Sequence, residues 1–275
     1  MIQSPTPRNL KLRWTCCLLP RLTGRRYSLG VIQVRVLSFG VLKDRFGSAA
    51  ATLELPEGAT VGSLLEQLSE RQPAAPLRGI AVSVNAEYAL VNQELKNGDE
   101  VGLLPPVSGG AEDPNFTASD DTHIALTRET IAGDALVAAA KRGGDGAVVV
   151  FDGIVRNNTR SRQTLYLDYE AYEEMAAKQM RVLAAEARTR FGVRHVTLVH
   201  RLGRLMVGET SVLIVVASAH RAQAYDASRW LIDTLKKTVP IWKRETFVDG
   251  AVWADGEPFP AALVVETASD TEAAR

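Results

Sequence analysis

The sequence predicts an α+β protein in which a small mixed sheet with one helix precedes a larger α/β domain. Residues 31–110 read in order as strand, strand, helix, strand, short strand and strand. Residues 121–260 instead alternate apolar strands with amphipathic helices. The segment between them, residues 111–120, is polar and aperiodic and contains a proline, so we expect a linker there.

The first domain begins with a strand, because apolar and polar residues alternate from Val31 to Phe39. A loop and a second strand, Thr52 to Leu55, precede a helix over residues 61–72 with Thr60 as its N-cap. Four apolar residues share one face of this helix: Val61, Leu64, Leu65 and Leu68. The remaining strands are expected at residues 81–85, 88–92 and 100–106. One helix across such a sheet predicts a β-grasp fold.

The second domain is expected to begin with a strand over residues 122–127 and a helix from Thr130 to Arg142, which Gly143 and Gly144 end. The run from Ala147 to Phe151 is continuously apolar, so we expect a buried strand. Further strands are predicted at residues 165–171, 195–200 and 211–217, and helices at residues 175–191 and 221–238.

Composition excludes several classes of protein. Lys and Arg total 32, as do Asp and Glu, so no overall field favours nucleic acid or membrane partners. No apolar run reaches the roughly 18 residues that a membrane span needs. The two cysteines, Cys16 and Cys17, are adjacent and predict neither a disulfide framework nor a metal site. A cytoplasmic protein without a cofactor is therefore expected.

The ends of the sequence carry little periodicity. Residues 1–30 contain a short apolar stretch flanked by arginines, which does not fit a signal peptide. We expect a disordered leader or an over-extended reading of the gene, and a flexible tail over residues 261–275.

Basic residues gather around a rigid apolar corner in the segment LKKTVPIWKRE, residues 235–245. Lys236 closes the last predicted helix, Pro240 prevents its continuation, and Lys243 follows on extended chain. A solvated helix end would show the same cations, since they favour helix C-termini. Lysines crowded by other cations have lowered pKa values, however, and can exchange protons near neutrality or hold an adduct.

Other basic residues stand where predicted elements begin or end. Arg156 follows a strand, and His220 and Arg221 lie at a strand-to-helix junction, where backbone N–H groups favour an anion. Forked arginine donors suit a phosphorylated substrate, although a strand-end cation and a structural histidine remain alternatives. His200 and Arg201 form a second pair, which we assign to domain structure or an interface.

Residues 31–110 resemble the small subunit of molybdopterin synthase in length, in the segment VNQELKNGDEV and in the ending PPVSGG. That family is a ubiquitin-like sulfur carrier whose terminal Gly-Gly is activated by an adenylating and sulfurating enzyme and becomes a thiocarboxylate. The resemblance makes Gly109 and Gly110 the carrier tail, although two glycines also suit a flexible joint. Because an amide joins Gly110 to Ala111 here, it further implies that a processing protease cuts between them.

Five segments between residues 121 and 256 resemble, in order and spacing, the large catalytic subunit of molybdopterin synthase: FDGIVRNNTR, LDYEAYEEMA, HRLGRLMVGE, SAHR and LKKTVPIWKRE. The resemblance implies an α/β hammerhead fold and a homodimer through this domain. It implies sulfur transfer from two carriers to cyclic pyranopterin monophosphate (precursor Z), which yields the dithiolene of molybdopterin. Lys236 and Lys243 match the catalytic lysines. The matching substrate-binding positions are Ile154, Val155, Arg156, His220, Arg221, Lys236, Lys243, Arg244 and Glu245.

Two other functions remain open. A module that binds a pterin or nucleotide phosphate without turnover would keep the basic residues but would not need both lysines or the Gly-Gly ending. A fusion in which the small domain only stabilises the large one predicts no cleavage at Gly110.

Overall fold

The computed structural model describes residues 30–71, 77, 79–106, 121–254, 256, 259 and 264. The leader up to residue 29, the linker, Gly109 and Gly110, and the C-terminal tail apart from residue 264 lie outside the described residues. None of the helices within these ranges is long and apolar enough to cross a membrane.

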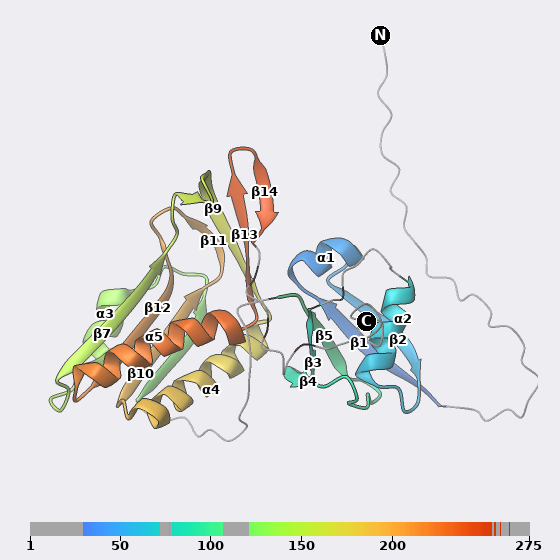
Figure 1. The fold of residues 1–275 in the computed structure, drawn as a ribbon, viewed down its shortest axis with the longest axis horizontal. Coiled ribbons are helices and arrows are strands. Elements are labelled where there is room, and N and C mark those ends of the chain that lie inside the picture. The colour runs from blue at the N-terminus through green and yellow to red at the C-terminus, as the bar shows by residue number, and fades with distance from the viewer. Residues whose placement is uncertain are drawn as a thin grey trace, which may run out of the picture.

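The N-terminal part is a mixed five-stranded sheet with the strand order β2-β1-β5-β3-β4. Strand β1 pairs antiparallel with β2 and parallel with β5. The helix α2 (Val61–Arg71) packs on this sheet (Figure 1). The predicted β-grasp arrangement is thereby confirmed. Its strands are β1 (Val31–Ser38), β2 (Ala50–Pro56), β3 (Ala81–Val84), β4 (Glu87–Ala89) and β5 (Glu100–Leu104).

The start of α2 follows the sequence prediction closely. The Ser63 N–H donates to Thr60 Oγ1 at 3.3 Å, and the Thr60 N–H donates to Ser63 Oγ at 2.8 Å. These two bonds satisfy backbone donors that a helix start leaves free, so Thr60 is the N-cap as predicted. The four predicted apolar residues are all buried: Val61, Leu64, Leu65 and Leu68.

The predicted loop after β1 is wrong in one respect, because it contains the helix α1 (Gly40–Phe46). With seven residues, α1 is too short for hydrophobic periodicity to reveal it. Gly40 and Gly47 at its ends have φ angles of 51° and 67°, which glycine adopts without strain. The helix buries Leu42 and places Phe39, directly before it, at the side of the second domain.

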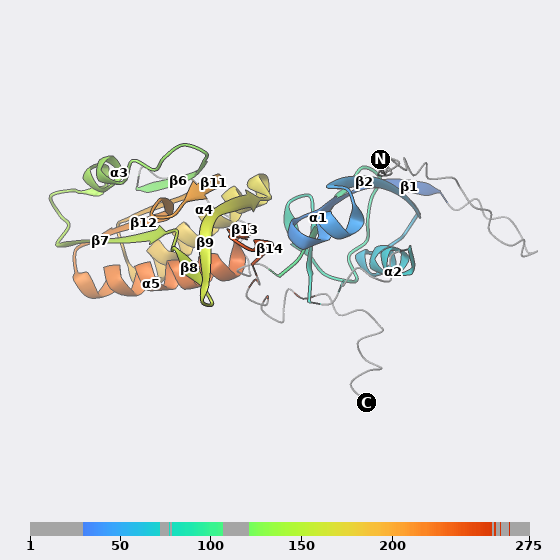
Figure 2. The ribbon, with the colours of Figure 1, turned by 90° about the horizontal axis from the view of Figure 1, so that it is seen from above.

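The second part contains a four-stranded sheet with the order β6-β10-β12-β7. The helices α4 (Glu173–Phe191) and α5 (Arg221–Thr238) cover one face, and α3 (Gly133–Ala140) lies on the other (Figure 2). The predicted α/β domain is confirmed. Its strands are β6 (Thr122–Thr127), β7 (Ala147–Ile154), β10 (His195–Arg201) and β12 (Thr210–Ser218).

Two predictions within this sheet layer need correction. The strand β7 lies at an edge of its sheet and is only half-buried, with Val150 44% exposed, rather than buried throughout. The apolar residues of this run point alternately to the two faces of the sheet, so only every second one packs on α4 and α5. The helix α3 is also shorter than predicted, because Lys141 is extended and the Arg142 N–H donates to Asp145 Oδ2 in a turn.

A third, antiparallel sheet with the order β11-β9-β13-β14 stands beside the end of α5, and β8 pairs with β9. The chain turns through Val239 and Pro240 directly into β13, so the predicted apolar corner exists and Lys243 lies on a strand. Its strands are β8 (Asn158–Thr159), β9 (Arg162–Ala171), β11 (Gly203–Met206), β13 (Ile241–Phe247) and β14 (Gly250–Trp253).

An aromatic stack joins the two parts of the chain. The Phe39 ring stacks on Trp242 with centroids 5.0 Å apart and an interplanar angle of 9°, and on Tyr172 at 5.0 Å and 24°. The Trp242 Nε1–H donates to the Pro105 carbonyl at 3.3 Å, and the Tyr172 hydroxyl donates to Glu100 at 2.6 Å. Aromatic pairs of this kind contribute about 0.5–1.5 kcal/mol beyond the area that they bury.

Polar pairs surround this stack. Lys43 pairs with Glu170 at 3.0 Å, the Trp253 Nε1–H donates to Asp44 at 2.9 Å, and Lys178 pairs with Glu87. Exposed pairs contribute little to stability individually, so they fix orientation more than affinity.

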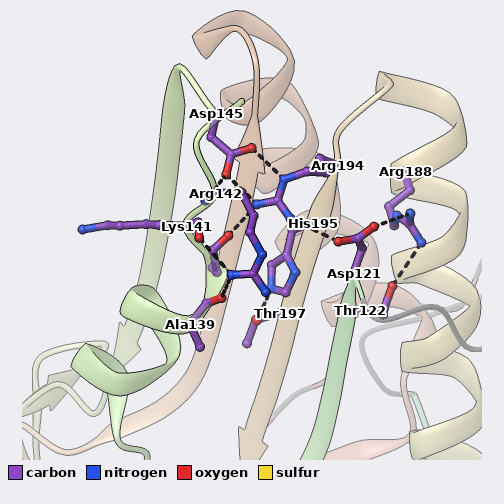
Figure 3. A network of polar contacts seen from close by, with 11 residues as sticks. Asp121, Thr122, Ala139, Lys141, Arg142, Asp145, Arg188, Arg194, His195 and Thr197 are labelled. Atoms are coloured by element: carbon purple, nitrogen blue, oxygen red, sulfur yellow. Dashed lines mark hydrogen bonds and ion pairs between the residues drawn. The ribbon is translucent and has the colours of Figure 1, made fainter.

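A polar network holds the opposite end of the second part, where the described chain resumes at Asp121 (Figure 3). Arg194 pairs with Asp145 at 2.5 Å and with Asp121 at 3.1 Å. The hydrogen bond from Arg194 holds the pKa of the Asp145 carboxyl below its ordinary value. This contribution to stability is therefore present at neutral pH and is lost only as the pH falls through that lowered pKa.

The stack predicts a specific loss of stability. Phe39→Ala removes the ring that contacts both Trp242 and Tyr172, and we expect the free energy of unfolding to fall by about 2 kcal/mol. Denaturant unfolding of the full chain, followed by tryptophan fluorescence, measures this change. The matched control is Leu90→Ala, because Leu90 is 63% exposed. Equal midpoints for the two variants would show that the stack does not stabilise the chain.

Candidate functional site

A cavity of about 560 Å³ opens where the end of α5, the start of β13 and the end of β7 meet. In Figure 1 the C-terminal end of α5 points toward the N-terminal part of the chain. Pro106, the last described residue of that part, also lies in the cavity wall. The wall contains five of the predicted site residues: Ile154, Arg156, Lys236, Lys243 and Glu245.

Lys236 reaches the wall because it lies in the last turn of α5. Its neighbour Leu235 is buried, and the Val239 N–H caps the turn by donating to the Leu235 carbonyl at 3.1 Å. Consecutive helix residues point about 100° apart, so Lys237 projects in another direction and is not part of the wall.

Lys243 and Glu245 lie two residues apart on β13 and therefore share a face of the strand. The Lys243 Nζ pairs with Glu245 Oε1 at 2.9 Å, while the Glu245 side chain is only 4% exposed. Its other oxygen, Oε2, is buried and has no hydrogen-bond partner. Besides the cations of the wall, Lys243 thus has a carboxylate as its direct neighbour.

Arg156 is placed by the residue before it. Val155 is 2% exposed, its N–H donates to the Glu209 carbonyl and its own carbonyl accepts from Gly208. Both main-chain groups of Val155 are thus occupied, and Val155 anchors the turn rather than lining the cavity. Arg244, between Lys243 and Glu245 on β13, is exposed and points away from them.

His220 and Arg221 lie at the other end of α5. Both are exposed, and about four helical turns, or roughly 22 Å, separate Arg221 from Lys236. Within one chain the structure therefore does not bring these two residues to the cavity that holds Lys236 and Lys243. The sequence analysis grouped these residues because each stands at the boundary of an element. Arg221 and Lys236 are 15 positions apart, which already indicated that the two lie at opposite ends of one helix.

Two further wall residues are Tyr169, which sequence reasoning did not single out, and His200, which it assigned to domain structure or an interface. His200 is buried near the end of β10, whereas Arg201 beside it pairs with Glu209 at 3.0 Å. Across the described ranges, no group of three or more His, Cys, Asp or Glu residues could hold a metal ion.

Comparisons with known proteins match the two parts of the chain to two different families. The family model described as MoaE protein matches residues 126–238, and that of the ThiS family matches residues 36–110. The chain is 42% identical over 123 residues to the molybdopterin synthase catalytic subunit of Pyrococcus abyssi. The matched region covers 45% of this chain and 81% of that protein. For the Thermoplasma volcanium subunit the identity is 39% over 130 residues, covering 47% and 95%.

Among solved structures, the crystal structure of molybdopterin synthase from Staphylococcus aureus is 38% identical. That match covers 47% of this chain and 95% of the other, with a TM-score of 0.46.

The fold and the matches together define a two-part enzyme, a β-grasp carrier-like domain joined to an α/β catalytic domain. The chain belongs to the family of molybdopterin synthase catalytic subunits and carries a ThiS-family domain fused before it. Both resemblances drawn from the sequence are thereby confirmed.

Proposed function

We propose that this chain is a cytoplasmic enzyme that carries its own sulfur donor and makes the dithiolene of molybdopterin from precursor Z. Its carrier domain would span residues 31–110, its linker 111–120 and its catalytic domain 121–260. The observation that carries the proposal is the position of Pro106 in the same cavity wall as Lys236 and Lys243.

Covalent geometry supports delivery of the carrier tail to this cavity. Gly110 is four residues beyond Pro106, so an extended chain reaches about 14 Å from the wall. The hydrogen bond from Trp242 Nε1–H holds the Pro105 carbonyl, which would fix the point from which the tail starts. Glycines without side chains suit a narrow approach to a buried substrate.

The chemistry needs two rounds of sulfur transfer. In each, the sulfur of a Gly110 thiocarboxylate bonds to a substrate carbon, and an oxygen leaves that carbon with a proton. Water then cleaves the acyl–sulfur bond, which returns the Gly110 carboxylate and leaves a thiolate on the substrate. Lys236 and Lys243 would supply the proton and stabilise the developing negative charge, while Arg156 would bind the phosphate.

The junction must open before this chemistry begins. An amide between Gly110 and Ala111 cannot be adenylated, so a processing protease would first release the Gly110 carboxylate. A separate adenylating and sulfurating enzyme would then convert it to the thiocarboxylate. The interdomain contacts would keep the two pieces associated after cleavage.

A homodimer would bring the remaining predicted residues to the cavity. Ile154 is 56% exposed in the cavity wall at the edge strand β7, and Val150 on the same strand is also exposed. A second copy docked along this edge would cover both side chains. Its His220 and Arg221 could then supply the phosphate contacts that the same residues cannot make within their own chain.

The two lysines give the first functional prediction. Lys236→Ala and Lys243→Ala should each abolish molybdopterin formation from precursor Z in a purified assay with thiocarboxylated carrier. The matched control is Lys237→Ala, which removes the same charge one position along α5 and should keep wild-type turnover. Full activity in both cavity variants would exclude these lysines from the reaction.

Mixing two variants tests the homodimer. Arg221→Ala should weaken precursor binding roughly tenfold to a hundredfold through the lost charged contact, and Lys236→Ala should be inactive. Co-expressed together, they should recover about a quarter of wild-type activity, because about half of the dimers are mixed and each has one intact site. No recovery would place Arg221 in its own chain's site, and an unaffected Arg221→Ala would place it in neither.

A further inference from the structure

His200 is a buried side chain in the cavity wall that the proposed sulfur transfer does not use. It lies next to the last residue of β10, and the residue is 4% exposed. The ring of Tyr169, from β9, meets it edge-on with centroids 5.1 Å apart and an interplanar angle of 68°. Two segments that are distant in the sequence therefore hold the imidazole in one orientation.

The hydrogen bond that His200 makes fixes its tautomer. Nδ1 lies 2.9 Å from the Arg201 carbonyl oxygen, which can only accept, so Nδ1 carries the proton. Burial lowers the pKa of His200 to about 4, so the ring is neutral at physiological pH. In a neutral ring with its proton on Nδ1, Nε2 has a free lone pair and is a hydrogen-bond acceptor.

Within the described part of the chain, Nε2 has no hydrogen-bond partner, because the single hydrogen bond of the side chain uses Nδ1. Nε2 is nevertheless not one of the unpartnered side-chain atoms that are fully enclosed by protein. The small exposed part of His200 therefore includes Nε2, and His200 is one of the residues that line the cavity. An acceptor left unpaired in such a place costs free energy unless an occupant donates to it.

The charge of the other wall residues decides which part of an occupant lies there. Lys236, Lys243 and Arg156 are cations suited to phosphate oxygens. A neutral acceptor offers a phosphate anion no donor, so it must face a different part of the ligand. Tyr169 and Trp242 add aromatic side chains to the same wall, a composition that suits a planar ring.

We propose that His200 positions the substrate, with Nε2 accepting a hydrogen bond from an N–H group of its pterin ring. The inference rests on the proposed function and adds a specificity contact at the heterocyclic end of the cavity. The phosphate end would remain with the basic residues.

Two substitutions separate this role from a structural one. His200→Asn keeps a donor near the Arg201 carbonyl but removes the acceptor, whereas His200→Gln can place its amide oxygen near the position of Nε2. We expect His200→Asn in the full chain to bind precursor Z about tenfold more weakly by calorimetry, and His200→Gln to recover most of that loss. The reverse order would show that His200 only supports the fold, and would overturn the inference.

A histidine on the same strand provides the control. His195 lies at the other end of β10, where its Nε2 contacts Thr197 Oγ1 at 2.8 Å (Figure 3). His195→Asn should leave precursor binding unchanged. Thermal unfolding of all three variants shows whether any loss of binding reflects loss of the fold.

A measurement on the wild-type chain does not depend on substitutions. The ¹⁵N resonance of His200 Nε2 should move toward that of a hydrogen-bonded nitrogen when precursor Z is added, while the His195 resonance stays in place. Binding without a shift at His200 would overturn this inference and leave the proposed function intact. Failure of the wild-type chain to bind precursor Z would overturn both.

Discussion

The stacking of Phe39 on Trp242 is the contact on which the arrangement of this protein depends. Trp242 follows the corner at Pro240, where α5 has ended, and it lies between Lys236 and Lys243 in the sequence. All three residues line the cavity. The Phe39 ring stacks on this indole, whose Nε1–H also donates a hydrogen bond to the Pro105 carbonyl. One side chain thus borders the candidate site and contacts the N-terminal part of the chain, so the packing between the two parts affects the shape of the cavity.

The fusion turns association of carrier and catalyst into an event within one chain. The linker is short, and tethering of this kind raises the effective concentration of one domain near the other to the millimolar range. While the chain is uncut, the polar pairs around the stack need contribute little affinity, and their exposure agrees with a role in orientation. In the proposed mechanism, the peptide bond that tethers the two domains also blocks the carboxylate that a sulfur carrier needs, so the proposal depends on the Gly110–Ala111 junction.

Much of the fold could be predicted because its periodic segments are long. The Thr60 cap and the apolar face of α2 follow from local chemistry that the sequence displays. The helix α1 could not be found this way, since seven residues do not complete two helical turns. The partial exposure of β7 could not be predicted either, because an apolar run does not show which element covers each face of the strand. In the site, the corner at Pro240 identified Lys236 and Lys243, whereas the pairing of Glu245 with Lys243 and the place of His200 required the tertiary structure.

The central claim is that the Gly110 tail of this chain delivers sulfur to its own catalytic cavity after the junction is cut. Intact mass spectrometry of the protein from its native host, combined with a molybdopterin assay of the same sample, tests it most directly. The account predicts two associated fragments, with the N-terminal one ending at Gly110 and a fraction of it heavier by the exchange of one oxygen for one sulfur. A single uncut chain that still makes molybdopterin when given a sulfur source would contradict the account.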